Sequence, residues 1–420
     1  MHDSVTAASA RVSRATALLA IAAFASGSNL RVADPLIPKL SHDFSVSVGA
    51  AAYIVAAFTL AYGSVQLVSG PLADRAGKLR TVGVALLIAA AGSFACYFAP
   101  SLPVLTALRF VTGIGAGGII PLALAFIADN VPYEKRQLAF GRFMGAVLLG
   151  QAFGPLIGGV LSDHVSWRTV FVLLGVIFFA VSVPLLLEAR RQPVPLVAAQ
   201  SGGFNPFARY RELLADRWVR IVVGTVGIEG LLFYGGLAYL GAYLKLRFDL
   251  GYGVIGLIVA GFSLGGLLYS VSVQPLVRRL GEKGLVRVGG VVLLISFVGI
   301  VAAPTWWISV PFFIGIGFGF YMFHNTLQTR ASEMAPHARG SAVSLFAFSL
   351  FLGQAAGVAA FGAGISLLGY VPMLVGAGVG LAVLGHWFRR RLAAHRTEIS
   401  TPQHRGTEDT EIHRESQERK

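Results

Sequence analysis

The stretch Gly70-Pro-Leu-Ala-Asp-Arg-Ala-Gly77 recurs 204 residues later as Gln274-Pro-Leu-Val-Arg-Arg-Leu-Gly281, and both copies lie between long apolar runs. Two more stretches recur at nearly the same offset. Gly113-Ile-Gly-Ala-Gly117 returns as Gly315-Ile-Gly-Phe-Gly319, and Leu149-Gly-Gln-Ala-Phe-Gly154 returns as Leu352-Gly-Gln-Ala-Ala-Gly357. Three matches in register indicate that the chain is built from two copies of one unit.

The composition is that of a membrane protein. Of the 420 residues, 55% are hydrophobic and 13% are charged, and the mean hydropathy is +0.70, which excludes an ordinary soluble domain. About 20 apolar helical residues cross a bilayer core. Twelve runs reach about this length: 15–39, 47–70, 81–99, 103–127, 138–161, 167–187, 219–244, 252–275, 285–303, 306–328, 341–367 and 370–388. We therefore expect an all-α membrane protein with twelve transmembrane helices in two six-helix halves, residues 15–187 and 218–388.

Arginine and lysine predict the orientation of these spans. Of the 34 such residues, 28 lie in the two tails and in the connections that follow even-numbered spans. By the positive-inside rule, both termini are cytoplasmic in a multi-pass protein of the cell (inner) plasma membrane. The net charge of +14 comes from these loops and the tail rather than from one folded basic face, so we expect no nucleic-acid partner.

Two tails and a linker flank the halves. Residues 1–14 are expected to form a cytoplasmic N-terminal tail, and the charged residues 389–420 a disordered cytoplasmic tail. The cytoplasmic linker, 188–217, contains a stretch at 207–214 that could form a short amphipathic helix on the inner leaflet. A single cysteine, Cys96, excludes an intramolecular disulfide and a cysteine-rich metal site.

The loop after the second span carries a signature. The stretch from Gly70 to Lys78, with Asp74, Arg75 and Gly77 between them, resembles the loop motif of the major facilitator superfamily, and the likeness extends to all twelve spans. The resemblance implies that Asp74 holds a cytoplasmic gate closed by capping a helix N-terminus in the other half, where free N–H groups and the helix dipole stabilise a carboxylate. The alternative is a solvated loop that only obeys the positive-inside rule.

The fourth span contains a buried cation. Leu105-Thr-Ala-Leu-Arg-Phe-Val-Thr-Gly-Ile-Gly-Ala-Gly117 resembles the second signature of the same family, with Arg109 as its intramembrane arginine and Thr112 where glutamine is common. An arginine within a span costs about 2.5–3.5 kcal/mol on insertion scales and needs a carboxylate or water nearby. The resemblance implies a role in proton transfer; the alternative is an ion pair that locks this helix to the first.

The fifth span matches a third signature in full. Gly150-Gln-Ala-Phe-Gly154-Pro155-Leu-Ile-Gly158-Gly159 resembles the motif of the twelve-helix drug/proton antiporters. Glycines at this spacing let helices approach closely, and the proline weakens one backbone bond and permits a bend. Packing alone is the alternative interpretation. In the second half Val358 replaces the proline, so the motif is complete only once.

Two carboxylates lie inside predicted spans. Asp34 and Arg109 are each about six residues from the outer ends of their helices, so they can meet at one depth, and Arg31 lies one turn from Asp34 on the same face. Glu229 is near the midplane of the seventh span without an obvious basic partner. These four residues are our candidates for proton coupling; a hydrogen-bonded structural acid is the alternative for Glu229.

Aromatic residues near these acids predict a lipophilic cavity. The candidates for its lining are Phe58, Tyr62, Phe233, Tyr234 and Phe320. Apolar and π surfaces beside one or two carboxylates favour lipophilic and cationic compounds over sugars, which need many buried polar partners. His324, near the inner end of the tenth span, is interpreted as a hydrogen-bonded packing residue rather than a proton relay.

These features together predict a secondary active transporter that exchanges protons for small lipophilic or cationic compounds by alternating access between the halves. The proton gradient would drive it without a cofactor or metal, and the family resemblance implies a functional monomer. The alternative is a metabolite or sugar transporter, exporter or symporter, on the same fold. An intramembrane enzyme is disfavoured because the sequence holds no Gly-x-Ser-x-Gly or His-Glu-x-x-His motif.

Overall fold

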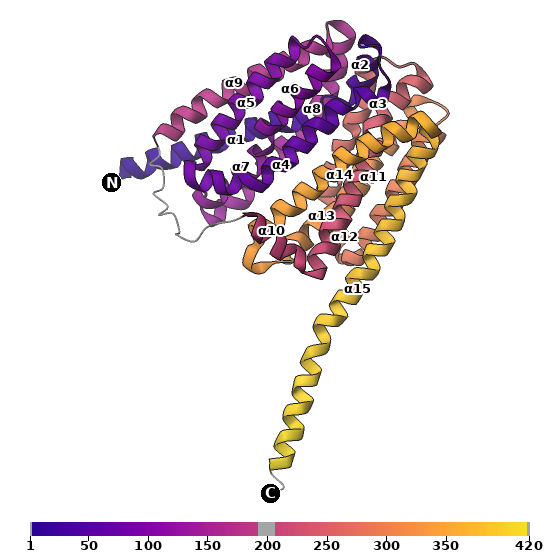
Figure 1. Cartoon of the computed structure of the whole chain (residues 1–420). Coiled ribbons are helices and arrows are strands. Elements are labelled where there is room, and N and C mark those ends of the chain that lie inside the picture. Colours follow the sequence, from indigo (N-terminus) through magenta and orange to yellow (C-terminus); the bar gives the residue numbers. More distant parts are fainter. Residues whose placement is uncertain (1, 192–205, 418–420) are drawn as a thin grey trace.

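A computed structural model describes residues 2–191 and 206–417, and all regular structure in this part of the chain is helical (Figure 1). The N-terminal half contains α1 (His2–Arg31), η1 (Asp34–Leu36), α2 (Ile37–Asp43), α3 (Val48–Ala51), α4 (Tyr53–Ala76), α5 (Lys78–Tyr97), α6 (Leu102–Gly117), α7 (Ile119–Asn130), α8 (Tyr133–His164) and α9 (Trp167–Arg190). The C-terminal half, preceded by α10 (Pro206–Ala215), contains α11 (Arg217–Phe248), α12 (Tyr252–Ala302), α13 (Trp306–Glu333), η2 (Pro336–Ala338), α14 (Arg339–Leu368) and α15 (Tyr370–Gln417).

Proline and glycine set several helix boundaries. Pro35 and Pro38 stand in the first turns of η1 and α2, where a missing N–H costs nothing, so the first predicted span ends in two short elements after α1. Gly77 (φ 86°) ends α4 and Gly281 (φ 58°) interrupts α12, each with a backbone conformation that L side chains rarely adopt. These two glycines occupy equivalent positions in the repeat.

Eleven helices of the described residues are long and apolar enough to cross a membrane, one fewer than the twelve predicted runs. The difference lies in α12, whose 51 residues include both the predicted run 252–275 and the predicted run 285–303. The non-helical backbone at Gly281 falls between the two runs. The connection predicted there is thus a kink in one assigned helix instead of a separate loop.

Each half packs as a bundle of its own. In the N-terminal half α1 contacts α8, α5 contacts α9, and α4 contacts α6; in the C-terminal half α11 contacts α14, and α12 contacts α13 and α15. The two halves meet through α8 against α12 and α4 against α14. In the repeat, α8 corresponds to α14, and α4 corresponds to the first part of α12. The two contacts between the halves are therefore equivalent to each other.

The halves pack more closely at one end than at the other. At the end that carries α2 and α3, called the α2 end, Gly49 lies against Gly362, and Gly159 lies against Tyr252. At the opposite end, called the linker end, a methyl group added to Gly70 would meet no atom within 4 Å. Figure 1 shows the ribbons of the two halves together near α2 and α3 and apart toward α10.

Both predicted tails contain helical residues. α1 already begins at His2, and α15 continues to Gln417 as the long helix at the C-terminus in Figure 1, where composition predicts disorder from residue 389. The first turns of this extension have partners, because Leu392 is buried and the ring of His395 stacks on Trp218 with centroids 3.9 Å apart. Much of the predicted linker, 192–205, lies outside the described residues, whereas α10 covers its predicted amphipathic stretch.

Candidate functional site

The end of α1 carries a buried ion pair. Arg31 is the last residue of α1 and Asp34 the first of η1, so the two side chains are one turn apart. Arg31 Nη1 lies 3.3 Å from Asp34 Oδ2, and both side chains are at most 3% exposed. Asp34 Oδ1 and Arg31 Nε and Nη2 have no hydrogen-bond partner among the described residues.

Arg109 takes a different partner from the one expected. Its guanidinium donates to the side-chain oxygen of Asn29 and, over 3.0 Å from Nη2, to the Asn29 carbonyl oxygen, and it lies 4.2 Å from the ring centroid of Phe58. Among the described residues, the Arg109 guanidinium forms no ion pair with Asp34, since no nitrogen of Arg109 lies within 4.0 Å of an Asp34 carboxylate oxygen. Arg31 is nearer along the helix and pairs with the carboxylate in this conformation. That Asp34 and Arg109 can meet at one depth stays a prediction. Arg109 instead joins α6 to α1 through a neutral side chain.

Arg31 also reaches into the other half. Its guanidinium carbon lies 4.4 Å from the ring centroid of Tyr234 on α11 and 5.3 Å from that of Phe262 on α12. A guanidinium within about 6 Å of a ring is attracted by the ring quadrupole, more strongly when both are buried. The Arg31–Asp34 pair thus belongs to the interface between the halves, close to the C-terminal aromatic residues.

Glu229 has a partner that sequence reasoning missed. Its Oε2 lies 2.9 Å from His324 Nδ1 of α13, and the Glu229 side chain is 0% exposed. The His324 ring stacks on Phe320, with centroids 4.9 Å apart and an angle of 13° between planes. This contact corrects the expectation that Glu229 lacks a basic partner, whereas His324 is hydrogen-bonded and packed as predicted. Glu229 Oε1 has no hydrogen-bond partner among the described residues.

The predicted cavity residues fall into two aromatic groups. Phe233, Tyr234 and Phe320 form one group in the C-terminal half, with Phe233 stacked on Phe320 at 4.2 Å and Tyr234 at 5.5 Å from Phe320. Phe58 and Tyr62 form a second group on α4, 5.7 Å apart. All five side chains are buried. Their predicted role as a substrate cavity stays a prediction.

The loop motif does not bridge the halves in this conformation. Asp74 and Arg75 are exposed and form no hydrogen bond or ion pair among the described residues, and Gly77 supplies the turn between α4 and α5. Lys78 pairs with Asp129 at the end of α7, within its own half. The gating role of Asp74 stays a prediction for a conformation in which the linker end is closed.

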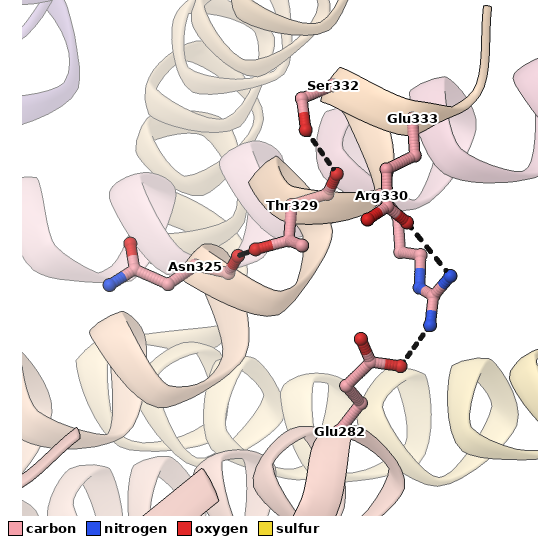
Figure 2. A network of polar contacts seen from close by, with 6 residues as sticks. All are labelled: Glu282, Asn325, Thr329, Arg330, Ser332 and Glu333. Atoms are coloured by element: carbon pink, nitrogen blue, oxygen red, sulfur yellow. Dashed lines mark hydrogen bonds and ion pairs between the residues drawn. The ribbon is translucent and has the colours of Figure 1, made fainter. Parts of the chain in front are cut away.

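The second half has the equivalent of the Lys78–Asp129 pair with the charges exchanged. Glu282, which follows Gly281 as Lys78 follows Gly77, pairs with Arg330 near the end of α13 (Figure 2). Arg330 Nη1 also lies 3.1 Å from Glu333, one turn further along the helix. Each pair ties the helical segment that follows the loop glycine to the linker end of another helix of the same half.

The glycine motif of α8 is a packing surface on two sides. Added methyl groups at Gly150 and Gly154 would collide with the backbone carbonyl oxygens of Phe24 and Ser28 on α1, and one at Gly158 with that of Val32 just after α1. Gly159 points the other way and touches the backbone of Tyr252 on α12, beside the contact of Pro155 with Gly256. The motif therefore seats α8 between its own half and the other half. The structure places α8 at the interface between the halves.

Comparisons with known proteins agree with this architecture. A family model described as Major Facilitator Superfamily matches residues 19–358. The uncharacterized MFS-type transporter YwfA of Bacillus subtilis (strain 168) is 26% identical over 84% of this chain and 86% of its own length. The multidrug export protein EmrB of Haemophilus influenzae is 29% identical, but the match covers 38% of this chain and 31% of EmrB.

A solved structure shares the fold. A bacterial homologue of the human lysosomal transporter Spinster, in an inward-facing and unoccupied conformation, aligns with a TM-score of 0.70 at 17% identity, over 91% of this chain and 97% of its own. Since the family model covers most of the chain, this protein belongs to the Major Facilitator Superfamily and is a multi-pass membrane transporter rather than an enzyme.

Proposed function

We propose that this transporter exports small lipophilic or cationic compounds in exchange for protons, by alternating access. The observation that carries the proposal is the pair of the fully buried Glu229 with His324, whose imidazole stacks on Phe320. Tyr234, whose ring receives Arg31 from the other half, lies against the same Phe320 ring. Acidic, basic and aromatic groups of both halves are thus gathered where the halves meet.

A buried carboxylate of this kind favours exchange. A charged carboxylate inside a membrane protein is costly, and such groups are retained mainly where they take part in transport. A proton and a cationic cargo neutralise the same Glu229 carboxylate, so binding of one promotes release of the other. This competition between proton and cargo is the requirement for antiport, and the unpartnered Oε1 leaves an acceptor available to either.

The Arg31–Asp34 pair would couple protonation to movement of the halves. When Asp34 gains a proton, its attraction for Arg31 weakens, and the contacts of Arg31 with Tyr234 across the interface change with it. In this proposal protons from outside reach Asp34 and Glu229, cargo leaves outward, and deprotonation toward the cytoplasm resets the site. Arg109 holds α1 in place through Asn29. The membrane potential contributes about 2.3 kcal/mol per charge per 100 mV, so no cofactor is required.

The topology in this proposal has twelve spans with both termini in the cytoplasm of a cell (inner) plasma membrane. α12 has 51 residues, enough for more than twice the roughly 30 Å of a bilayer core, and Gly281 is the point at which it would turn back. Most arginines and lysines lie toward the linker end, which the positive-inside rule places in the cytoplasm. The conformation closed at the α2 end is then the inward-facing one, in a functional monomer.

The alternative cargo is a polar metabolite or sugar. Two buried polar atoms favour this polar cargo, because Gln354 Oε1 and Asn29 Nδ2 have no hydrogen-bond partner among the described residues. A hydroxyl-rich cargo would satisfy such atoms. The aromatic group around Phe320 and the match of part of this chain to a multidrug export protein favour the lipophilic class.

The test uses inverted membrane vesicles that hold an imposed pH gradient. Ethidium, tetraphenylphosphonium, a hexose and a nucleoside are added in turn, and the loss of the gradient is followed. We expect a lipophilic cation to release protons in vesicles with the unchanged protein, and Glu229→Gln or Asp34→Asn to abolish that release. Glu188→Gln is the matched control, because Glu188 is also a buried carboxylate but lies at the end of α9.

The outcomes separate the two cargo classes. Proton release triggered only by the hexose or the nucleoside would favour the polar cargo and overturn the lipophilic one. A correctly inserted protein that releases protons with neither class would contradict antiport itself.

A further inference from the structure

Asp163 makes a contact between the halves that the transport site does not use. It lies one residue before the end of α8, and its two carboxylate oxygens face the start of α12 in the other half. The backbone N–H of Tyr252 donates to Oδ1 over 2.9 Å, and that of Gly253 donates to Oδ2 over 2.7 Å. These are the first two N–H groups of α12, which have no partner inside their own helix.

The start of α12 has no cap from its own chain segment. Gly251 occupies the N-cap position and has no side chain to accept these N–H groups, whereas α11 begins with Asp216, which accepts from Trp218 and Val219. A carboxylate at a helix N-terminus is stabilised by free N–H groups and by the helix dipole. Asp163 therefore serves as the N-cap of a helix in the opposite half.

The surrounding backbone is shaped for this approach. A methyl group added to Gly251 would lie 3.0 Å from Asp163 Oδ2, and one added to Gly253 would lie 3.2 Å from it. One turn before Asp163, Gly159 touches the backbone of Tyr252. Glycines on both helices thus let the end of α8 and the start of α12 come together closely enough for the carboxylate to bridge them.

The repeat supplies an internal comparison. The repeat equivalent of the α8–α12 contact is the contact of α14 with α3. There Gly362 of α14 lies against Gly49 of α3, as Gly159 of α8 lies against Gly253 of α12. The residue equivalent to Asp163 is Ser366, whose hydroxyl donates to the Gly362 carbonyl of its own helix over 3.0 Å. The close packing is therefore duplicated, while the carboxylate bridge belongs to the α8–α12 crossing.

We propose that Asp163 is a latch that holds the α2 end closed. It gives the form of the transporter seen here two hydrogen bonds across the halves, and these break when the α2 end opens. Asp74 at the linker end is exposed and has no bond among the described residues, so of these two acidic residues Asp163 is the one that caps a helix of the opposite half in this state. The latch concerns the alternating movement assumed by the proposed function, but it requires neither proton exchange nor any particular cargo.

The test measures distances between spin labels across the two ends, without substrate or a pH gradient. In a Cys96→Ala background, labels at Val165→Cys and Leu246→Cys report the α2 end, and labels at Leu138→Cys and Val277→Cys report the linker end. All four positions are exposed. Asp163→Ala is expected to raise the ratio of the form open at the α2 end to the closed form about 2- to 30-fold, the range for loss of a helix cap. The linker-end distances should shorten in the same proportion of molecules.

Two further variants make the result decisive. Asp163→Asn preserves the shape and one acceptor oxygen, so it should fold and give a smaller shift in the same direction. Asp249→Asn is the matched control, because Asp249 is an exposed carboxylate at the same end that pairs with Lys245 of its own half, 2.8 Å away. Unchanged distance distributions in folded Asp163→Ala and Asp163→Asn would overturn the latch. Failure of proton exchange alone would leave these distances unaffected, so the two proposals fail separately.

Discussion

Gly154→Ala tests whether the glycine motif of α8 is first of all a packing surface. Gly154 lies so close to the carbonyl oxygen of Ser28 on α1 that an added methyl group would overlap it, and Gly150 meets Phe24 in the same way one turn earlier. A carbonyl oxygen cannot rotate away as a long side chain can. The two helices would have to separate, with loss of contact along their shared face.

The size of the effect follows from two opposing terms. Overpacking a close contact costs about 1–3 kcal/mol, whereas replacing glycine by alanine inside a helix gains about 0.8–1 kcal/mol. Gly145→Ala in the same helix carries the second term alone, because an added methyl group there meets no atom within 4 Å. The difference in unfolding free energy between the two variants should therefore be about 1–3 kcal/mol, with Gly154→Ala the less stable.

The assay is unfolding in detergent, followed by tryptophan fluorescence for both variants and the unchanged protein. Gly145→Ala should unfold at the same or a higher denaturant concentration than the unchanged protein, and Gly154→Ala at a lower concentration than Gly145→Ala. Equal midpoints for the two variants would refute the packing argument and return the motif to a purely functional interpretation.

Three other substitutions test contacts outside the glycine motif. Arg109→Lys should lower the free energy of unfolding by about 1.5–3 kcal/mol, since a lysine cannot reproduce the two charge-assisted bonds to Asn29. Unfolding in detergent measures this loss, and an unchanged midpoint would contradict the contact. Lys78→Ala should cost no more than about 1 kcal/mol, because its pair with Asp129 is partly exposed and screened, and 0.5 M salt should remove the effect. Tyr210→Phe removes the hydroxyl that donates to a carbonyl oxygen of α4 over 2.9 Å; burial raises the pKa of this hydroxyl, so the donor stays protonated at neutral pH. Faster amide hydrogen exchange in α10 is expected for Tyr210→Phe, and equal exchange would show that the bond does not hold α10.

Local sequence signals predict much of the fold because they act through the backbone. The loop glycines Gly77 and Gly281 need a positive φ, and that requirement is visible as a repeat in the sequence. Apolar length predicts the spans in the same way, since a helix must satisfy its backbone hydrogen bonds inside a bilayer. At the C-terminus the helix extends beyond the last predicted span, which apolar length does not predict.

The site could be predicted only in part, because a helix's rotation about its axis is set by tertiary packing. Asp34 and Arg31 are one turn apart, so their pairing is a local property that the sequence reveals. Glu229 and His324 lie 95 residues apart on different helices, and nothing in either segment shows that they face each other. The same limit hides Asp163, whose partners are backbone N–H groups rather than a side chain that a pattern could identify.

Proton release on substrate binding tests the central claim most directly. The purified protein in weakly buffered detergent solution receives ethidium, and the pH change and the bound ethidium are measured together. Antiport at Glu229 predicts that binding releases protons into solution, and that Glu229→Gln binds ethidium without releasing them. Binding to the unchanged protein with no proton release, or equal release from Glu229→Gln, would contradict the account.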